Sequence, residues 1–215
     1  MSLAKKINTQ KSFKDWILEV KKNKKVSIKK INYISCIKRK KGDFSLSTID
    51  TEITYNDKTY QRAVQLEGKS VVIIPVIKQK NKLKTLLVSQ FRAPKASLNL
   101  EFPSGKAEHY SLKKSAQLEI KEEIGLEVSQ SILKPLNKKP IYMLPANNFS
   151  QVYYFYFIKK VQNDFFNKFK NKTFGKTDEG EHIKLKFVDF SDLLNITNSA
   201  SVIIGYALLK KNEIL

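Results

Sequence analysis

Apolar residues recur at helical spacing near the amino terminus. Phe13, Trp16, Ile17 and Val20 occupy the i, i+3, i+4 and i+7 positions of residues 11–23, which predicts an amphipathic helix with Ser12 as its N-cap. Shorter, loosely alternating runs follow and predict strands, the last two on either side of an Asn-Asp hairpin signal. These strands cover residues 26–37, 44–49, 52–55 and 59–66. The first 66 residues therefore predict a helix and a small sheet.

The remainder of the chain mixes strand-like and helix-like patterns. Residues 70–77 form an almost continuous apolar run that is typical of a buried strand, and residues 85–91 pair back on it after a polar turn. A helix is predicted from about Ser111 to Ile124, with Gly125 at its C-cap. Further strands are predicted near residues 139–144, 151–158 and 183–188, and further helices near residues 190–195 and 198–212.

This order of elements predicts an α/β fold with a mixed sheet. We expect two regions, residues 1–66 and 67–215, because Glu67-Gly68 reads as a turn between the small sheet and the mixed region. The length of 215 residues and the apolar content of 41% are enough for a packed core.

Composition narrows the setting. No stretch reaches the roughly 20 apolar residues that cross a bilayer, and the first 16 residues lack the apolar run of a secretory signal. With Cys36 as the only cysteine and with two histidines, neither an internal disulfide nor a Cys/His zinc site is expected. We therefore expect a cytoplasmic protein with no membrane partner.

The net charge of +20 suggests a polyanionic partner. However, only Arg39, Arg62 and Arg92 among the 40 basic residues are arginine, whose planar fork suits the recognition of phosphates and bases better than lysine does. The lysines are also scattered along the chain. Nucleic acid is therefore a partner that the charge permits without favouring it, and the scarcer acidic residues carry more information.

Three glutamates share one side of the predicted helix at 111–124. Helical geometry places Glu119, Glu122 and Glu123 within an arc of roughly 100°. Such crowding is costly unless a cation offsets it, and hard divalent cations prefer carboxylate oxygens. A Pro-Ser-Gly turn just upstream can aim the Ser104 carbonyl at the same ion. These residues indicate metal-assisted diphosphate hydrolysis, while a solvated acidic helix face remains the alternative.

Residues 105–126 resemble the Nudix box, Gly-x5-Glu-x7-Arg-Glu-U-x-Glu-Glu-x-Gly-U, where U is a bulky aliphatic residue. The second half is in register, and the flanking segments LVSQFR at 87–92 and EFPSG at 101–105 are similar to those of the ADP-ribose pyrophosphatase branch. The box positions in register are Glu119, Ile120, Glu122, Glu123, Gly125 and Leu126. The resemblance implies a Nudix-type α/β/α sandwich with a mixed sheet, extended by a small N-terminal helix and sheet.

The resemblance also implies a set of site residues. A Mg²⁺ ion, with Mn²⁺ as the alternative, would be held by the Ser104 carbonyl, Glu119, Glu122 and Glu123. The general base would be Glu122 or a glutamate of a later loop, Glu179 or Glu181. Arg92, Arg62 and Glu101 would bind substrate, and the N-terminal extension would build a homodimer.

By this resemblance the expected activity is Mg²⁺-dependent hydrolysis of a nucleoside diphosphate sugar, above all of ADP-ribose to AMP and ribose 5-phosphate. The box departs from the family at two places: Leu118 stands where the family has arginine, and the first box glutamate falls at Tyr110 or Ser111. Two alternatives therefore stay open. One is a non-catalytic Nudix-fold protein that binds a nucleotide or RNA, and the other is a hydrolase of another nucleoside diphosphate-linked compound.

Overall fold

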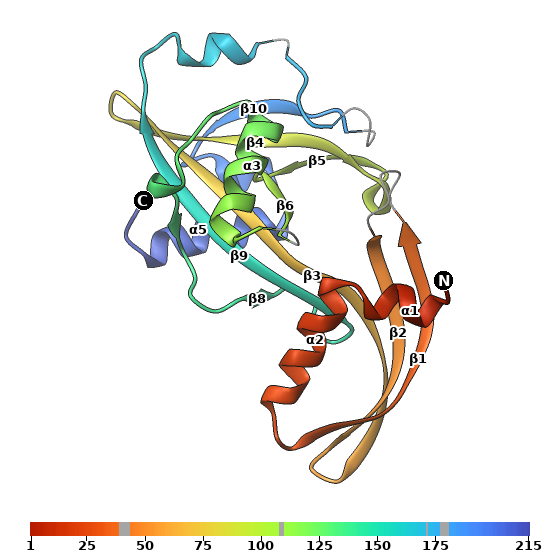
Figure 1. Cartoon of the computed structure of the whole chain (residues 1–215). Coiled ribbons are helices and arrows are strands. Elements are labelled where there is room, and N and C mark those ends of the chain that lie inside the picture. The colour runs from red at the N-terminus through yellow and green to blue at the C-terminus, as the bar shows by residue number, and fades with distance from the viewer. Residues whose placement is uncertain (39–43, 108–109, 171, 177–180) are drawn as a thin grey trace. The chain divides into compact units, whose positions relative to one another are not determined.

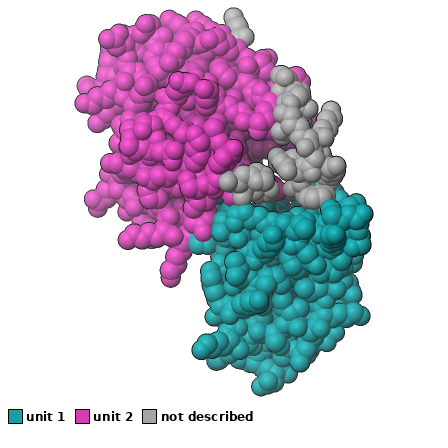
Figure 2. Space-filling view, viewed as in Figure 1, with its two compact units in different colours: residues 1–70, 140–152 teal, residues 71–139, 153–215 magenta. Residues whose placement is uncertain are grey.

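The computed structural model describes residues 1–38, 44–107, 110–170, 172–176 and 181–215 (Figure 1). The chain divides into two compact units (Figure 2). Unit 1 comprises Met1–Ser70 and Pro140–Val152, and unit 2 comprises Val71–Lys139 and Tyr153–Leu215. The sequence placed residues 140–152 in the second region, whereas they cluster with the first.

Unit 1 is a curved antiparallel sheet with two helices. Strands β1 (Val26–Lys38) and β2 (Phe44–Tyr55) pair from Val26 opposite Tyr55 onward, and β2 pairs with the first part of β3 (Lys58–Gln79). Asn56 and Asp57 have φ values of 45° and 60°, so the predicted hairpin is confirmed, with the backbone that a type I′ turn requires. The helices are α1 (Leu3–Asn8) and α2 (Lys11–Lys22), and the short strand β8 (Ile141–Tyr142) also belongs to this unit.

Two local predictions for unit 1 are wrong, and both concern the place where Ser12 of α2 packs against Gly68 of β3. Ser12 is not the N-cap of α2; Gln10 is, and its side chain contacts Cys36 and Ser47 instead. Glu67-Gly68 is not a turn, because β3 continues through it to Gln79. Gly68 has φ +79°, and a Cβ there would lie 3.0 Å from the Cβ of buried Ser12. The glycine therefore marks a close approach of α2 to the strand.

Unit 2 carries the rest of the sheet and the remaining helices. In the sheet as a whole, which begins with β1 and β2 of unit 1, the strands run in the order β1-β2-β3-β4-β10; β5 pairs with β4, and β9 pairs with β3, β7 and β8. Bounds in this part are β4 Lys82–Arg92, β5 Ser97–Glu101, β6 Ser104–Lys106, β7 Lys134–Pro135, β9 Asn148–Lys160 and β10 Lys184–Asp189. The helices are α3 Leu112–Ile124, α4 Leu193–Ile196 and α5 Ala200–Lys211, and short 3₁₀ turns are η1 Ala93–Lys95, η2 Gln130–Ile132 and η3 Phe165–Phe169.

Helices cover both faces of β3 in unit 2, which Figure 1 shows as α3 in front of the sheet and α5 behind it. Ile73 packs in the buried cluster that contains Ile120 of α3. Its neighbour Ile74 points to the opposite face, where a Cβ at Gly205 of α5 would lie 2.8 Å from it. This two-sided burial explains the continuous apolar run at residues 70–77 and confirms the predicted α/β class. In the described part of the chain, none of the helices combines the length and the hydropathy of a membrane span.

Candidate active site

Helix α3 is fixed at both ends by its own sequence. The Ser111 hydroxyl accepts a hydrogen bond from the Lys114 amide at 3.3 Å, and Gly125 ends the helix with φ +63° and donates its N–H to the Lys121 carbonyl. Ile120 and Ile124 are fully buried against the sheet. Because the apolar face is anchored in this way, the rotation of the helix, and so the direction of its glutamates, is determined.

Glu123 lies at the centre of the site. Its side chain is 4% exposed, and the Ser104 amide donates a hydrogen bond to Oε2 at 2.8 Å. Burial raises the pKa of Glu123 well above its ordinary value; the Ser104 hydrogen bond opposes this rise, and the charges of Glu119 and Glu181 add to it. Arg92 opposes it further. The carboxylates of Glu119 and Glu181 therefore both lie within electrostatic reach of Glu123 in unit 2.

Glu119 lies against the glycine loop. A Cβ built on Gly105 would overlap the Glu119 carboxylate, so only glycine leaves room for that group. The Pro-Ser-Gly turn that the sequence singled out thus receives two glutamates of α3, one at the Ser104 amide and one over Gly105. The hydrogen bond involves the amide of Ser104, and metal binding by its carbonyl stays a prediction.

We expect Gly105→Ala to displace the Glu119 carboxylate and to lower the turnover of the diphosphate substrate about 10- to 100-fold. The three atoms nearest to the methyl group all belong to the end of this flexible side chain, which can move aside, so the melting temperature should change little. Steady-state kinetics and thermal unfolding of the purified variant check both statements. Wild-type turnover would show that the position of Glu119 is irrelevant.

A short segment before Glu181 binds the carboxyl end of α3. The Gly175 amide donates to the Glu122 carbonyl at 3.2 Å, and the Lys176 ammonium lies 2.8 Å from Glu122 Oε1. The Lys176 amide donates to Glu181 Oε2 at 3.1 Å. This segment therefore brings Glu181 to the α3 side of the site and places a lysine on Glu122. Sequence reasoning missed Lys176, because one lysine among thirty-seven carries no distinguishing signal.

Arg92 and Glu101 form a two-pronged ion pair. Arg92 Nε and Nη2 donate to the Glu101 carboxylate at 3.0 and 2.6 Å, and Asn99 donates to it at 2.7 Å. Burial raises the pKa of Glu101, but the hydrogen bonds from Arg92 and Asn99 lower it below its ordinary value. The hydrogen bond to Glu101 raises the pKa of Arg92, and Glu123 and Glu181 contribute to that rise. The guanidinium thus belongs to the same electrostatic group as the three carboxylates.

The roles of two predicted residues are not tested by the structure. Arg62 lies in unit 1, where it is exposed, donates to the Gln61 carbonyl at 2.8 Å and lies 5.5 Å over the ring of Tyr60. Glu179 lies outside the described residues. Their roles stay predictions.

Around Leu118, where the box lacks its arginine, hydrogen bonds of the neighbouring Gln117 hold α3. Leu118 lines a surface pocket of about 430 Å³ on α3, together with Gln117 and Lys121. Gln117 donates to the Val128 carbonyl at 2.7 Å and accepts from the Lys114 ammonium at 3.1 Å. These bonds connect α3 to the segment that follows it, at the place where the sequence lacks the arginine.

The carboxylates of Glu119, Glu123 and Glu181 have the chemistry that a divalent cation requires of its ligands. Carboxylate oxygens are hard ligands, and a cation would offset the repulsion around buried Glu123. Among the described residues, no three acidic, histidine or cysteine side chains are gathered closely enough to form a complete ligand set by themselves. The residues that could contribute are Glu119, Glu123 and Glu122, whose carboxylate pairs with Lys176.

Comparison with known proteins gives three findings. Residues 67–204 match the family model described as NUDIX domain. Nudix hydrolase 14, chloroplastic, from Arabidopsis thaliana is 22% identical over 150 residues, which cover 66% of this chain and 48% of that protein. The chain thus spans about half the length of this relative. A solved structure described as "Crystal structure of ADP compounds hydrolase" superposes with a TM-score of 0.58 at 16% identity, covering 87% of this chain and 94% of the other, which supports the fold.

Proposed function

The match over residues 67–204 shows that this chain belongs to the Nudix family, and from this premise we propose that it hydrolyses the diphosphate of a nucleoside diphosphate sugar. ADP-ribose is the proposed substrate, with AMP and ribose 5-phosphate as products. The solved structure of similar fold is that of an ADP compounds hydrolase, which supports this choice of substrate. The observation that carries the proposal is the burial of Glu123 beside Glu119, Glu181 and Arg92.

Nudix hydrolases generally use divalent cations, and we propose Mg²⁺ here, with Mn²⁺ as a substitute. When bound, the ion supplies positive charge for the diphosphate and lowers the pKa of a bound water. Glu119 and Glu123 are the proposed ligands, completed by Glu122 and the Ser104 carbonyl. A ligand role for Glu122 requires the Lys176 ammonium to move away from its carboxylate.

The proton of the attacking water needs an acceptor. We assign this role to Glu181, which the Lys176 amide holds near Glu123. Glu179 and Glu122 are the alternatives. Arg92, oriented by Glu101, would donate to phosphate oxygens through the guanidinium edge that the ion pair leaves available.

Residues 1–66 are proposed as a dimerisation element that contributes to the adenine site, where Arg62 would stack or bind phosphate. Light scattering of the purified protein tests this part separately. A monomer at all concentrations would contradict it without affecting the assignment of the reaction.

Product analysis tests the proposed reaction. Incubation with ADP-ribose and Mg²⁺ should release AMP and ribose 5-phosphate, and EDTA should stop the release. A panel with a dinucleotide, a capped RNA and other nucleotide sugars serves as the comparison. If only another member of the panel is hydrolysed, that compound replaces ADP-ribose as the assigned substrate. If no member is hydrolysed, the proposed hydrolase activity is contradicted.

A further inference from the structure

A second, chemically different pocket lies in unit 2 at the tip of the β3–β4 hairpin. It has a volume of about 570 Å³ and is lined by Lys78, Lys80, Asn81, Leu83, Lys160 and Val161. The Val161 amide donates to the Lys78 carbonyl at 3.0 Å, which joins the end of β9 to the hairpin. Three lysines and one asparagine therefore line this pocket, and none of its described lining residues carries a carboxylate.

The lysines of this hairpin differ in their partners. Lys82 and Lys84 both pair with Asp189, at 3.5 and 3.1 Å. Lys78, Lys80 and Lys160 form no ion pair within the residues that the structure describes. Asp189 thus pairs with lysines outside the pocket lining, and among the described residues no ion pair offsets the charge of the three lysines in the lining.

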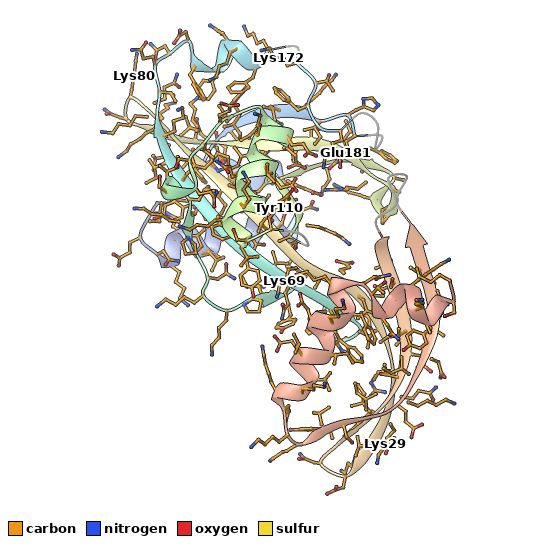
Figure 3. All side chains as sticks on the ribbon, viewed as in Figure 1. Lys29, Lys69, Lys80, Tyr110, Lys172 and Glu181 are labelled. Carbon is orange, nitrogen blue, oxygen red and sulfur yellow. The ribbon has the colours of Figure 1, made fainter. Side chains whose placement is uncertain are left out.

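A second group of lysines lies around η3, on the side of the sheet that also carries Lys84 and Lys159, the strand neighbours of the pocket residues Leu83 and Lys160. Burial lowers the pKa of Lys168, and the like charges of Lys159 and Lys172 lower it further, while the charge of Asp164 opposes this fall. Lys168 lies 4.2 Å over the ring of Phe165. In Figure 3 the side chains of Lys80 and Lys172 both lie at the outer edge of unit 2.

We propose that this lysine pocket binds the phosphate backbone of single-stranded nucleic acid. Ammonium groups act as point charges toward phosphates, and the absence of arginine from the pocket favours contacts with the backbone over recognition of base edges. A single strand is flexible enough to follow a concave surface, which a flat membrane cannot enter, and a positively charged groove that tracks the backbone is a common way to bind it. The binding is separate from the proposed hydrolysis, because none of these lysines belongs to the acidic site.

The test measures fluorescence anisotropy of a labelled oligouridylate at several salt concentrations. We compare the wild type with a triple variant, Lys78→Gln, Lys80→Gln and Lys160→Gln. The matched control replaces Lys24, Lys25 and Lys29, which are exposed in unit 1, by glutamine and so removes the same charge. Thermal unfolding confirms that both variants are folded.

The proposal predicts that the pocket variant binds roughly tenfold or more weakly at low salt, with a log–log salt dependence shallower by about 2, since each lost phosphate contact on a single strand contributes about 0.7. The control should stay close to wild type. An equal loss in both variants would show that net charge alone drives binding and would overturn the proposal. It would also be overturned by the absence of oligouridylate binding, or by tighter binding to phosphatidylserine vesicles than to the oligonucleotide.

Discussion

Replacing Glu123 by glutamine is expected to lower the rate of ADP-ribose hydrolysis about 10²- to 10³-fold. Glutamine keeps the volume of the side chain and an oxygen that can accept the Ser104 N–H, so the glycine loop should keep its place. What is lost is the negative charge at the centre of the acidic group, and with it the proposed metal ligand. Steady-state kinetics with Mg²⁺ measure the loss.

The same substitution should change the pH dependence of stability. The pKa of Glu123 is raised in the folded protein above its ordinary value of 4.5, chiefly by burial. Stability that depends on this group is therefore fully present below the unfolded pKa and declines as the pH rises through the folded pKa. Without metal, raising the pH from 4.5, the ordinary pKa of a glutamate, should therefore destabilise the wild type more than Glu123→Gln.

Thermal unfolding in EDTA across this pH range measures the difference. Glu127→Gln is the matched control, because Glu127 is exposed just beyond α3 and its hydrogen bond with Lys121 lowers its pKa. The control should keep wild-type turnover. Hydrolysis by Glu123→Gln at the wild-type rate would refute the assigned role of this carboxylate.

Removing the guanidinium of Arg92 should be the most destabilising change in the site. In Arg92→Met the Glu101 side chain, only 14% exposed, loses two charge-assisted hydrogen bonds. We expect a loss of roughly 2–3 kcal/mol in the free energy of unfolding, less than for a fully buried pair because Arg92 is partly solvated. Urea denaturation measures it.

The pH dependence of this loss has a defined sign. Burial raises the pKa of Glu101, but Arg92 and Asn99 lower it below 4.5 in total, so the pair contributes stability above the unfolded pKa and loses it as the pH falls through the folded pKa. Arg92→Met should therefore differ most from wild type at neutral pH. The double variant Arg92→Met, Glu101→Met should recover part of the loss, since no buried charge is left unpaired. Equal stability of Arg92→Met and wild type would contradict the account.

The acidic helix could be predicted because its signals are local. Ser111 at one end, Gly125 at the other and the apolar row of Ile120 and Ile124 lie within one short stretch of sequence, and each plays in the structure the part expected of it. The α/β class followed in the same way from the order of the strands and helices. Residues 67–204 match the family that the box resembled.

The contacts that the sequence did not reveal are made between distant segments. Lys176 reaches Glu122 across 54 positions of sequence, and Ser12 approaches Gly68 across 56, as their residue numbers give. No periodicity or motif specifies such pairs, because they depend on how strands and loops are arranged in space. For the same reason the sequence does not reveal that residues 140–152 belong to unit 1.

The most direct test of the central claim is a crystal structure with Mn²⁺ and a non-hydrolysable α,β-methylene analogue of ADP-ribose, with anomalous data collected for manganese. The account predicts anomalous density in contact with the carboxylates of Glu119 and Glu123, with the methylene-bridged diphosphate bound to the same ion and within reach of Arg92. Absence of such density at these two glutamates, or a diphosphate bound elsewhere on the protein, would contradict it.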